Sequence, residues 1–453
     1  MSLTTSWLSS TDVSPQPPPI ALFGWDLAAW RLAEADPGLR STVVGIVCVE
    51  GSLTATELMP KVMAAVSHNR VLRSRVVSGT SGPALEEMKT FDVGRCVAWS
   101  LDTADVAAVA HNLVETVFDS ELPLWRLAVV PTGERTFVVA ALHHAIADGN
   151  GALGLAGYLF DEFTISASDQ SAPRATETEE GATSASSRAA VTSAAARVLE
   201  RAIRDPQGLA RDVNVLVKSA TTLLSVPQQP HAQAMAKRSA SFGQTFYTFP
   251  KAVVRNAIAG RGVSQHDALV AVVCAALSDY HQRSGMKLEK LRINVPVALS
   301  VEKAQANQML VARLEMSLDD LHPAALMLQS NQLLHEWRSQ PALGLASELI
   351  EASRLVPSGL IASVVKKADA TISSLRGVAR LGHISGKRVS SIWPLVAPIG
   401  AAISITSVGV GSEVTMCVTH DEAAVADIDL WRSCLSAAMS QTAGVALIEH
   451  KFE

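Results

Sequence analysis

The sequence predicts two α/β sandwich domains, and three observations support this. The chain has 453 residues, which exceeds the usual size of a single domain. Hydrophobic residues make up 48% and charged residues 18%, enough apolar material for large cores. Both halves mix helical and strand patterns. Between them, residues 165–196 are rich in Ser, Ala, Thr and Glu, a composition that cannot bury a core.

These observations divide the chain into three parts. We expect an N-terminal domain over residues 1–164 and a linker with an amphipathic helix over residues 165–240. A C-terminal domain follows over residues 241–453.

Hydrophobic periodicity, caps and turns define the elements of the first half. Residues 1–20 are polar and Pro-rich and are expected to form a loose arm. The patterns then predict helix Asp26–Ala35, strand Thr42–Val49, helix Thr54–Ser67 capped by Thr54 or Thr56, strand Val93–Leu101 and helix Val106–Val117. The last three elements are strands Trp125–Val130 and Thr136–Leu142, joined as a hairpin by a turn with Gly133, and helix Ala152–Phe163.

The second half begins after the linker. Basic residues recur among Val, Leu and Ala over Ala194–Leu224, which indicates a helix packed on the fold or resting on a lipid surface. From Ser241 the patterns predict helices Ala252–Ala259, Asp267–His281, Pro323–Arg338, Ser347–Ser374 and Asp427–Met439, and strands Leu291–Val297, Met309–Met316, Gly386–Ile392, Ala401–Val408 and Glu413–Thr419. The apolar stretch Trp393–Val410 is broken by prolines and a glycine, so we interpret it as buried sheet rather than a membrane span.

Composition argues against several classes of function. The formal net charge is -5, whereas proteins that bind nucleic acid usually carry a strongly basic surface. The five cysteines are widely spaced and form no CxxC motif. We therefore expect their side chains to be small buried hydrophobic groups rather than metal ligands or disulfide partners. They are Cys48, Cys96, Cys274, Cys417 and Cys434. No secretory signal is visible, so we expect a cytoplasmic protein, with peripheral contact to a membrane or lipid droplet left open.

The segment from His143 to Gly149 reads His-His-Ala-Ile-Ala-Asp-Gly and carries the strongest chemical signal. It follows an apolar strand directly, and a glycine permits close backbone approach. A neutral imidazole can remove the proton of an attacking alcohol near pH 7. A thioester donor is already activated, so one base can suffice. The sequence lacks the Gly-x-Ser-x-Gly motif that would indicate a serine acyl-enzyme.

Each residue of this segment also has a plainer interpretation. The two histidines could be satisfied by backbone partners at a strand end, and adjacent strand residues make a poor chelating pair, so no metal is expected. Asp148 could orient an imidazole as in a triad, but we favour a role in holding the loop through backbone amides. Trp125 is interpreted as a core aromatic, with support of a channel wall as the alternative. Asp267 is expected to cap the helix that follows it.

The His-His-x-x-x-Asp-Gly segment resembles the signature of an acyltransferase superfamily, and other segments are similar to its bacterial wax ester synthase/acyl-CoA:diacylglycerol acyltransferase family. These segments are Leu122-Pro123-Leu124-Trp125, Ser264 to Val270, Gly386 to Val389 with Trp393-Pro394 and Pro398 to Gly400, and the landmarks Asp26, Arg73 to Arg75 and Phe91-Asp92. The similarity runs from about Gly24 to Gln441.

This resemblance implies two chloramphenicol-acetyltransferase-like domains with a channel between them. His144 would face the channel as general base, with His143, Asp148 and Gly149 completing the catalytic motif. Substrates would be acyl-CoA and a hydroxyl acceptor, a fatty alcohol or diacylglycerol, and no cofactor would be required. Substrate-channel or structural support would come from Pro123, Leu124, Trp125, Asp267 and Asn307.

The second half departs from the family pattern at several motifs. His266-Asp267 stands for Asn-Asp, Ala306-Asn307 for Gly-Asn, and Ser374 to Val378 for Asn-Val-Pro-Gly-Pro. Two alternatives therefore stay open. One is an enzyme of the same fold that acylates a polyketide or glycolipid alcohol, and the other is a non-catalytic lipid-binding homologue.

Overall fold

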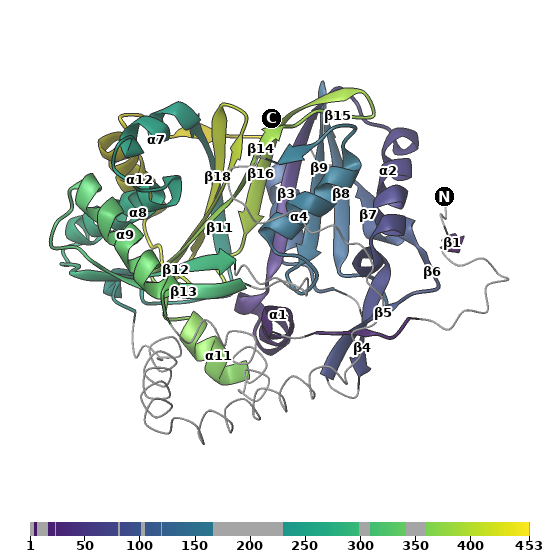
Figure 1. Ribbon diagram of the computed structural model, residues 1–453, viewed down its shortest axis with the longest axis horizontal. Helices are drawn as coiled ribbons and strands as arrows, with labels where there is room; N and C mark the ends of the chain where they lie inside the picture. Colours follow the sequence, from purple (N-terminus) through teal and green to yellow (C-terminus); the bar gives the residue numbers. More distant parts are fainter. Residues whose placement is uncertain are drawn as a thin grey trace, which may run out of the picture.

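A computed structural model describes residues 4–6, 17–22, 24–79, 82–100, 105–118, 120–165, 230–298, 309–340 and 358–452. The described chain forms two lobes side by side, each built around a large sheet (Figure 1). The predicted linker at 165–196 lies outside the described residues except for Ile165, and the predicted amphipathic helix Ala194–Leu224 lies entirely outside them.

The first lobe is built on a six-stranded sheet. Its order is β15 (His383–Ile384), β16 (Lys387–Val396), β3 (Thr42–Glu50), β9 (Arg135–His143), β8 (Trp125–Thr132) and β7 (Val97–Trp99). Helix α2 (Ala55–His68) packs on one face and α3 (Val106–Val114) on the other. Because both faces are covered, β9 is apolar on both sides, as the sequence predicts for a central strand.

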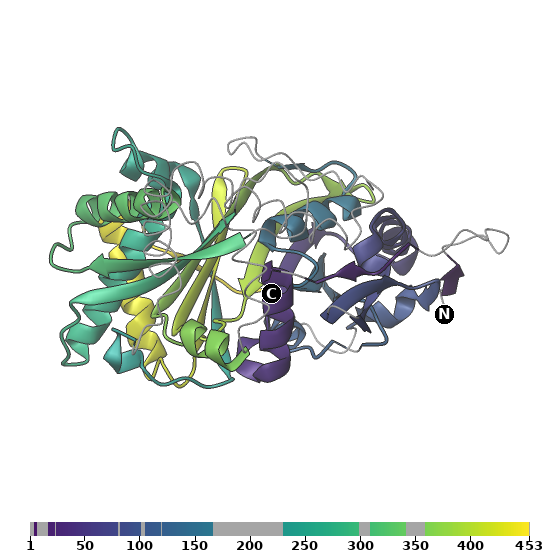
Figure 2. The ribbon, with the colours of Figure 1, turned by 60° about the horizontal axis from the view of Figure 1, so that its bottom comes forward.

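The second lobe is built on an eight-stranded sheet. Its order is β13 (Met309–Ser317), β12 (Lys290–Ala298), β14 (Ala370–Arg380), β17 (Ile403–Val410), β18 (Glu413–Asp421), β11 (Phe242–Pro250) and β19 (Ile448–His450), with β10 (Thr164–Ile165) on β14. One face is covered by α7 (Lys251–Ile258), α8 (Gln265–Arg283), α9 (Pro323–Arg338) and α12 (Ile428–Ala443) (Figures 1 and 2).

The two lobes share both strands and core. Strand β16, from the second half of the chain, pairs antiparallel with β3 of the first half. Phe246 and Cys417 of the second sheet pack in one apolar cluster with Val44 and Ile46 of the first. Helix α1 (Gly24–Ala35) also contacts α11 (Ser358–Val365) across the lower side of the molecule (Figure 2). The domain boundaries expected at residues 164 and 240 remain a prediction. Residues 387–396, from the second half of the chain, lie in the sheet of the first lobe.

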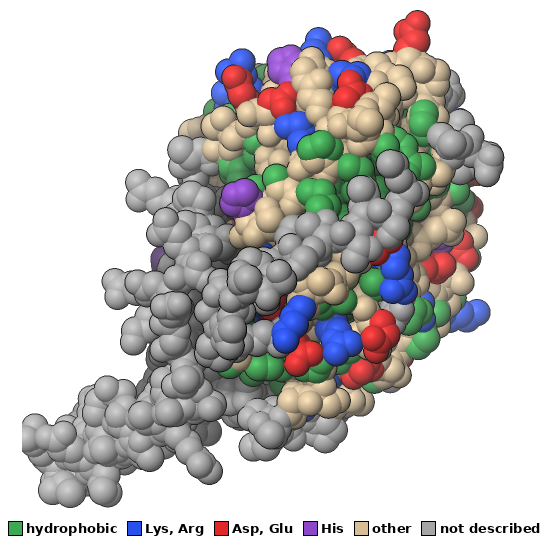
Figure 3. All heavy atoms as spheres, turned by 90° about the vertical axis from the view of Figure 1, so that its right-hand side faces the viewer, with side chains coloured by type: hydrophobic (Ala, Val, Ile, Leu, Met, Phe, Trp, Pro, Cys, Tyr) green, Lys and Arg blue, Asp and Glu red, His purple; other side chains and the backbone are tan. Residues whose placement is uncertain are grey.

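Small elements complete the first lobe. Three strands form a separate sheet in the order β2 (Ile20–Ala21), β5 (Gly82–Glu87) and β4 (Ser74–Gly79), and β1 (Thr4–Ser6) pairs with β6 (Thr90–Asp92). On the face in Figure 3, the coloured side chains include basic, acidic and apolar groups, so its charge is mixed rather than uniform. Within the first lobe, Arg73 pairs with Glu87, and Lys61 pairs with Asp161.

Most predicted elements are confirmed. Helix Pro323–Arg338 has the predicted bounds, and Thr54 caps α2 through a capping box with Glu57. The hairpin β8–β9 pairs in register. The stretch Trp393–Val410 forms the end of β16 and the whole of β17 as largely buried sheet, joined by a turn over residues 397–402. All five cysteines are buried and unpaired.

Several predictions were wrong. Residues 93–96 form a 3-10 turn, because the Asp92 carboxylate accepts the Gly94 N–H. Among the described residues of that predicted strand, which end at Ser100, only Val97–Trp99 is extended. The helix predicted over Val106–Val117 ends at Val114. The helix predicted over Ala152–Phe163 is α4 (Gly149–Ala156), followed by a 3-10 turn over Gly157–Leu159.

The predicted helix Ser347–Ser374 is partly wrong and partly untested. Residues 347–357 lie outside the described chain, 358–365 form α11, and residues 370–374 begin strand β14. Strand β14 lies parallel to both β12 and β17, so pairing with neighbours that are distant in sequence overrides the local helical pattern. The arm predicted over residues 1–20 contains β1, which is paired through its backbone.

Candidate functional site

The segment from His143 to Asp148, here called the histidine loop, begins at the end of β9 and is held by backbone hydrogen bonds on both sides. The His143 N–H donates to the Leu124 carbonyl at 2.9 Å, and the His144 N–H donates to the Ser41 carbonyl at 2.7 Å. Both residues are buried, with 4% of His143 and 8% of His144 exposed. The sheet therefore places two imidazoles in fixed positions where a buried strand ends.

His143 has the surroundings of a structural residue. Its Nδ1 accepts the Ala145 backbone N–H at 3.0 Å, so the proton of the neutral ring lies on Nε2. The ring lies against Trp30 and Phe118, with centroid separations of 5.5 and 5.7 Å. Burial lowers the pKa of His143 to about 3. This imidazole is therefore neutral at physiological pH and shapes the loop.

His144 has different partners. Its Nδ1 accepts the indole N–H of Trp25 at 3.1 Å. Burial lowers the pKa of His144, while the negative charge of Asp148 acts in the opposite direction. The ring is therefore held neutral near pH 7, which is the protonation state that a general base requires.

Asp148 organises the loop by capping a helix. It is the N-cap residue of α4, and its Oδ1 accepts the Gly151 N–H at 2.7 Å. The loop-holding role favoured from sequence thus has a direct structural basis. The same carboxylate also acts electrostatically on His144.

Gly149 is required by the contact between the lobes. A Cβ at this position would lie 2.4 Å from Cδ2 of Leu375, which belongs to β14 of the second lobe. Gly149 adopts no positive φ angle, so close packing rather than backbone conformation explains the glycine. The histidine loop consequently lies where the two lobes meet.

The segment Pro123-Leu124-Trp125 packs against the histidine loop. Pro123, Leu124 and Trp125 are buried, and the indole of Trp125 donates to the Leu72 carbonyl at 2.7 Å. Leu124 packs against Ala145 of the histidine loop. Trp125 is thus a core aromatic, as predicted, and the Leu124 carbonyl connects this segment to His143.

Asp267 lies in the first turn of α8 and completes a capping box with the N-cap residue Ser264, so it stabilises the helix start from within the helix rather than preceding it as predicted. Its Oδ2 accepts the backbone N–H of Ser264 at 2.8 Å, and its Oδ1 accepts the Ser330 hydroxyl at 2.7 Å. Asn331 also donates to this carboxylate. The buried Asp267 therefore joins α8 to α9. Asn307, which was predicted to support the channel or the structure, lies outside the described residues.

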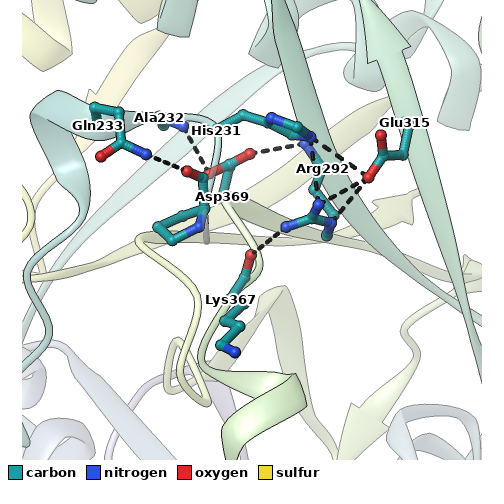
Figure 4. A network of polar contacts seen from close by, with 8 residues as sticks. His231, Ala232, Gln233, Arg292, Glu315, Lys367 and Asp369 are labelled. Atoms are coloured by element: carbon teal, nitrogen blue, oxygen red, sulfur yellow. Dashed lines mark hydrogen bonds and ion pairs between the residues drawn. The ribbon is translucent and has the colours of Figure 1, made fainter. Parts of the chain in front are cut away.

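A second cluster of charged groups lies in the other lobe (Figure 4). The buried Asp369 carboxylate accepts the backbone N–H groups of Ala232 at 2.9 Å and Arg292 at 2.7 Å. The Arg292 guanidinium pairs with Glu315 at 2.8 Å and donates to the Lys367 carbonyl. Burial raises the pKa of Asp369, and these hydrogen bonds oppose that rise. Every group in the cluster connects one segment to another, so we assign it a structural role.

Three aromatic residues of the site were not predicted from the sequence: Trp25, Trp30 and Phe118. Trp25 and Trp30 flank the landmark Asp26 on α1, and this proximity was the only available signal. Across the described ranges, no group of three His, Cys, Asp or Glu side chains has the arrangement of a metal site. No helix in the same ranges has the length and apolar character needed to cross a membrane.

Comparisons with known proteins match nearly the whole chain. The sequence model of the wax ester synthase/diacylglycerol acyltransferase catalytic domain matches residues 55–308, and that of the family's C-terminal domain matches residues 306–442. A Mycobacterium tuberculosis H37Rv protein, provisionally named a diacylglycerol O-acyltransferase, is 21% identical over 442 residues, which cover 91% of this chain and 90% of that protein.

Two solved structures share the fold. The wax ester synthase/diacylglycerol acyltransferase from Marinobacter aquaeolei VT8 aligns with a TM-score of 0.58 and 11% identity, over 93% of this chain and all of the other. A starter condensation domain of rhizomide synthetase, solved in complex with C8-CoA, aligns with a TM-score of 0.61 and 13% identity, over 96% of each chain. The two-domain chloramphenicol-acetyltransferase-like fold is therefore confirmed.

Proposed function

Because the chain belongs to the wax ester synthase/diacylglycerol acyltransferase family, we propose that it transfers an acyl group from acyl-CoA to a hydroxyl acceptor with His144 as general base. The observation that carries this proposal is the buried, neutral imidazole of His144 where the lobes meet. The solved complex of a condensation domain of this fold with C8-CoA supports the choice of donor.

The proposed reaction needs one proton acceptor. The imidazole takes the hydroxyl proton as the alcohol oxygen attacks the thioester carbonyl carbon. The C–S bond of the tetrahedral intermediate then breaks, and the CoA thiolate takes the proton from the imidazolium. Burial supports this role because it holds the imidazole neutral. No covalent enzyme intermediate is required.

Direct measurement of CoA release tests the base assignment. Purified protein is supplied with a long-chain acyl-CoA and either hexadecanol or diacylglycerol. His144→Ala should lower turnover by about 10²- to 10⁴-fold, the usual contribution of a positioned base. His335→Ala is the matched control, because His335 is exposed on α9 of the other lobe. Retained turnover in His144→Ala with an unchanged circular dichroism spectrum would reject the assignment.

The acceptor is proposed at the level of a fatty alcohol or diacylglycerol, giving a wax ester or triacylglycerol. A panel that adds polyketide and glycolipid alcohols tests the main alternative. Acyl-CoA binding without turnover on any acceptor would instead identify a lipid-binding homologue, an alternative that the departures at His266 and Ser374 to Val378 motivate.

A further inference from the structure

The indole of Trp25 donates a hydrogen bond to one of the two ring nitrogens of His144. Its N–H donates to Nδ1 at 3.1 Å, and the two rings meet edge to face, with an interplanar angle of 80°. Trp25 lies in the first turn of α1, directly after Gly24, which adopts a φ of 57°. This contact joins residues that are 119 positions apart in sequence.

The chemistry of a neutral imidazole makes this contact consequential. One ring nitrogen carries a proton and the other a lone pair. While Trp25 donates to Nδ1, that lone pair is occupied and the ring proton lies on Nε2. Neither nitrogen of His144 can then receive the proton of an alcohol.

The contact also differs from that of an orienting partner. A histidine that acts as base through Nε2 holds its proton on Nδ1 and donates it to a carboxylate or carbonyl oxygen. The indole has a donor and no acceptor, so it stabilises the opposite tautomer. The backbone of His144 also interacts with its own ring and favours the protonated imidazole.

We propose that Trp25 is a positioning residue that holds His144 in a resting tautomer and must leave Nδ1 before acyl transfer. This inference rests on the proposed function of His144 as the base. Trp25 is suited to such movement because it is only partly buried at the start of α1, whereas the helix is anchored by the buried Leu27 and Leu32 further along.

Trp25→Phe tests the proposal by removing the N–H while keeping an aromatic ring. Loss of a hydrogen bond of ordinary net strength corresponds to about a 2- to 10-fold change in equilibrium. We expect kcat/KM to rise by about this factor in CoA-release assays. The acid limb of the pH profile should also move upward by about 0.4 to 1 unit, because the indole stabilises the unprotonated ring.

The matched control is Trp30→Phe, the same change on the same helix, where the ring lies against His143 instead. It should not move the acid limb. The titratable groups nearest the ring, Asp148 and His143, are unchanged in both variants, as is the buried Asp26 beside Trp25. A shift in Trp25→Phe alone therefore reports on the indole N–H.

Nitrogen-15 NMR of labelled histidine reads the tautomer without any turnover. In the wild type, His144 should give the Nε2–H pattern, and Trp25→Phe should shift it toward Nδ1–H. A folded Trp25→Phe variant with lower kcat/KM and an unmoved acid limb, or with an unchanged tautomer, would overturn the proposal. Retained activity in His144→Ala would overturn the base assignment separately, since the tautomer experiment is independent of it.

Discussion

The contact between Gly149 and Leu375 gives a quantitative test of how the lobes meet. In Gly149→Ala the new Cβ would lie 2.4 Å from Cδ2, 3.4 Å from Cδ1 and 3.5 Å from Cγ of Leu375. The leucine must therefore move by roughly 1 Å to reach ordinary contact distance. Overpacking of this kind costs about 1–3 kcal/mol, and the colliding atom ends a flexible side chain, so we expect about 1–2 kcal/mol.

The same helix provides the control. A Cβ at Gly154 meets nothing within 4 Å, so Gly154→Ala should be neutral or stabilise by up to about 1 kcal/mol. Leu375→Ala makes room for the new methyl group. The double variant Gly149→Ala/Leu375→Ala should therefore lose at least about 1 kcal/mol less than the sum of the two single variants.

Guanidinium unfolding of the wild type and these four variants gives the required free energies. Additive losses in the double variant would refute the close-contact explanation for Gly149. So would a Gly149→Ala protein as stable as Gly154→Ala. Either result would mean that the lobes are not held at the distance described.

Three further outcomes follow from the buried histidines and helix caps, with His143 at the end of β9 and His420 in β18. His143 and His420 are buried with pKa values of about 3 and about 4 against an ordinary value of 6.5, so the folded state binds fewer protons. Stability should fall as pH drops below 6.5, by roughly 2 kcal/mol per histidine at pH 5, and a flat profile of denaturant midpoints would contradict this. Asp148→Ala should cost about 1 kcal/mol in thermal unfolding and Asp148→Asn only a few tenths, because Asn still caps Gly151; equal losses would show that charge matters more than the cap. Asp267→Ala should cost about 2–4 kcal/mol by leaving its buried donors unpaired, and unchanged stability would exclude that role.

The sequence predicted those elements whose local pattern agrees with their tertiary environment. Helix Pro323–Arg338 begins at a proline and keeps its period to the end, so its bounds were predicted correctly. The start of strand β14, residues 370–374, was predicted as helix because these residues lack a clear alternation. Parallel pairing with β12 and β17 supplies its hydrogen bonds, and no local signal reports such long-range pairing.

The candidate site shows the same division. A strand that is apolar on both faces and runs directly into His143 and His144 indicated the buried loop, and Gly149 indicated a close approach. The partner in that approach, Leu375, is 226 residues away. Only folding brings it close, since helix α4 of one lobe packs against β14 of the other.

By itself, the amino-acid sequence determined the α/β class, the central strand β9 and the His-His-x-x-x-Asp-Gly loop at its end, because hydrophobic period and spacing are local properties. The tertiary structure alone decided that β16 completes the first sheet and that His143 lies among aromatic rings. It also decided that Trp25 donates to Nδ1 of His144. These contacts join residues from different elements, and the protonation state and tautomer of a buried imidazole depend on such neighbours rather than on its own sequence position.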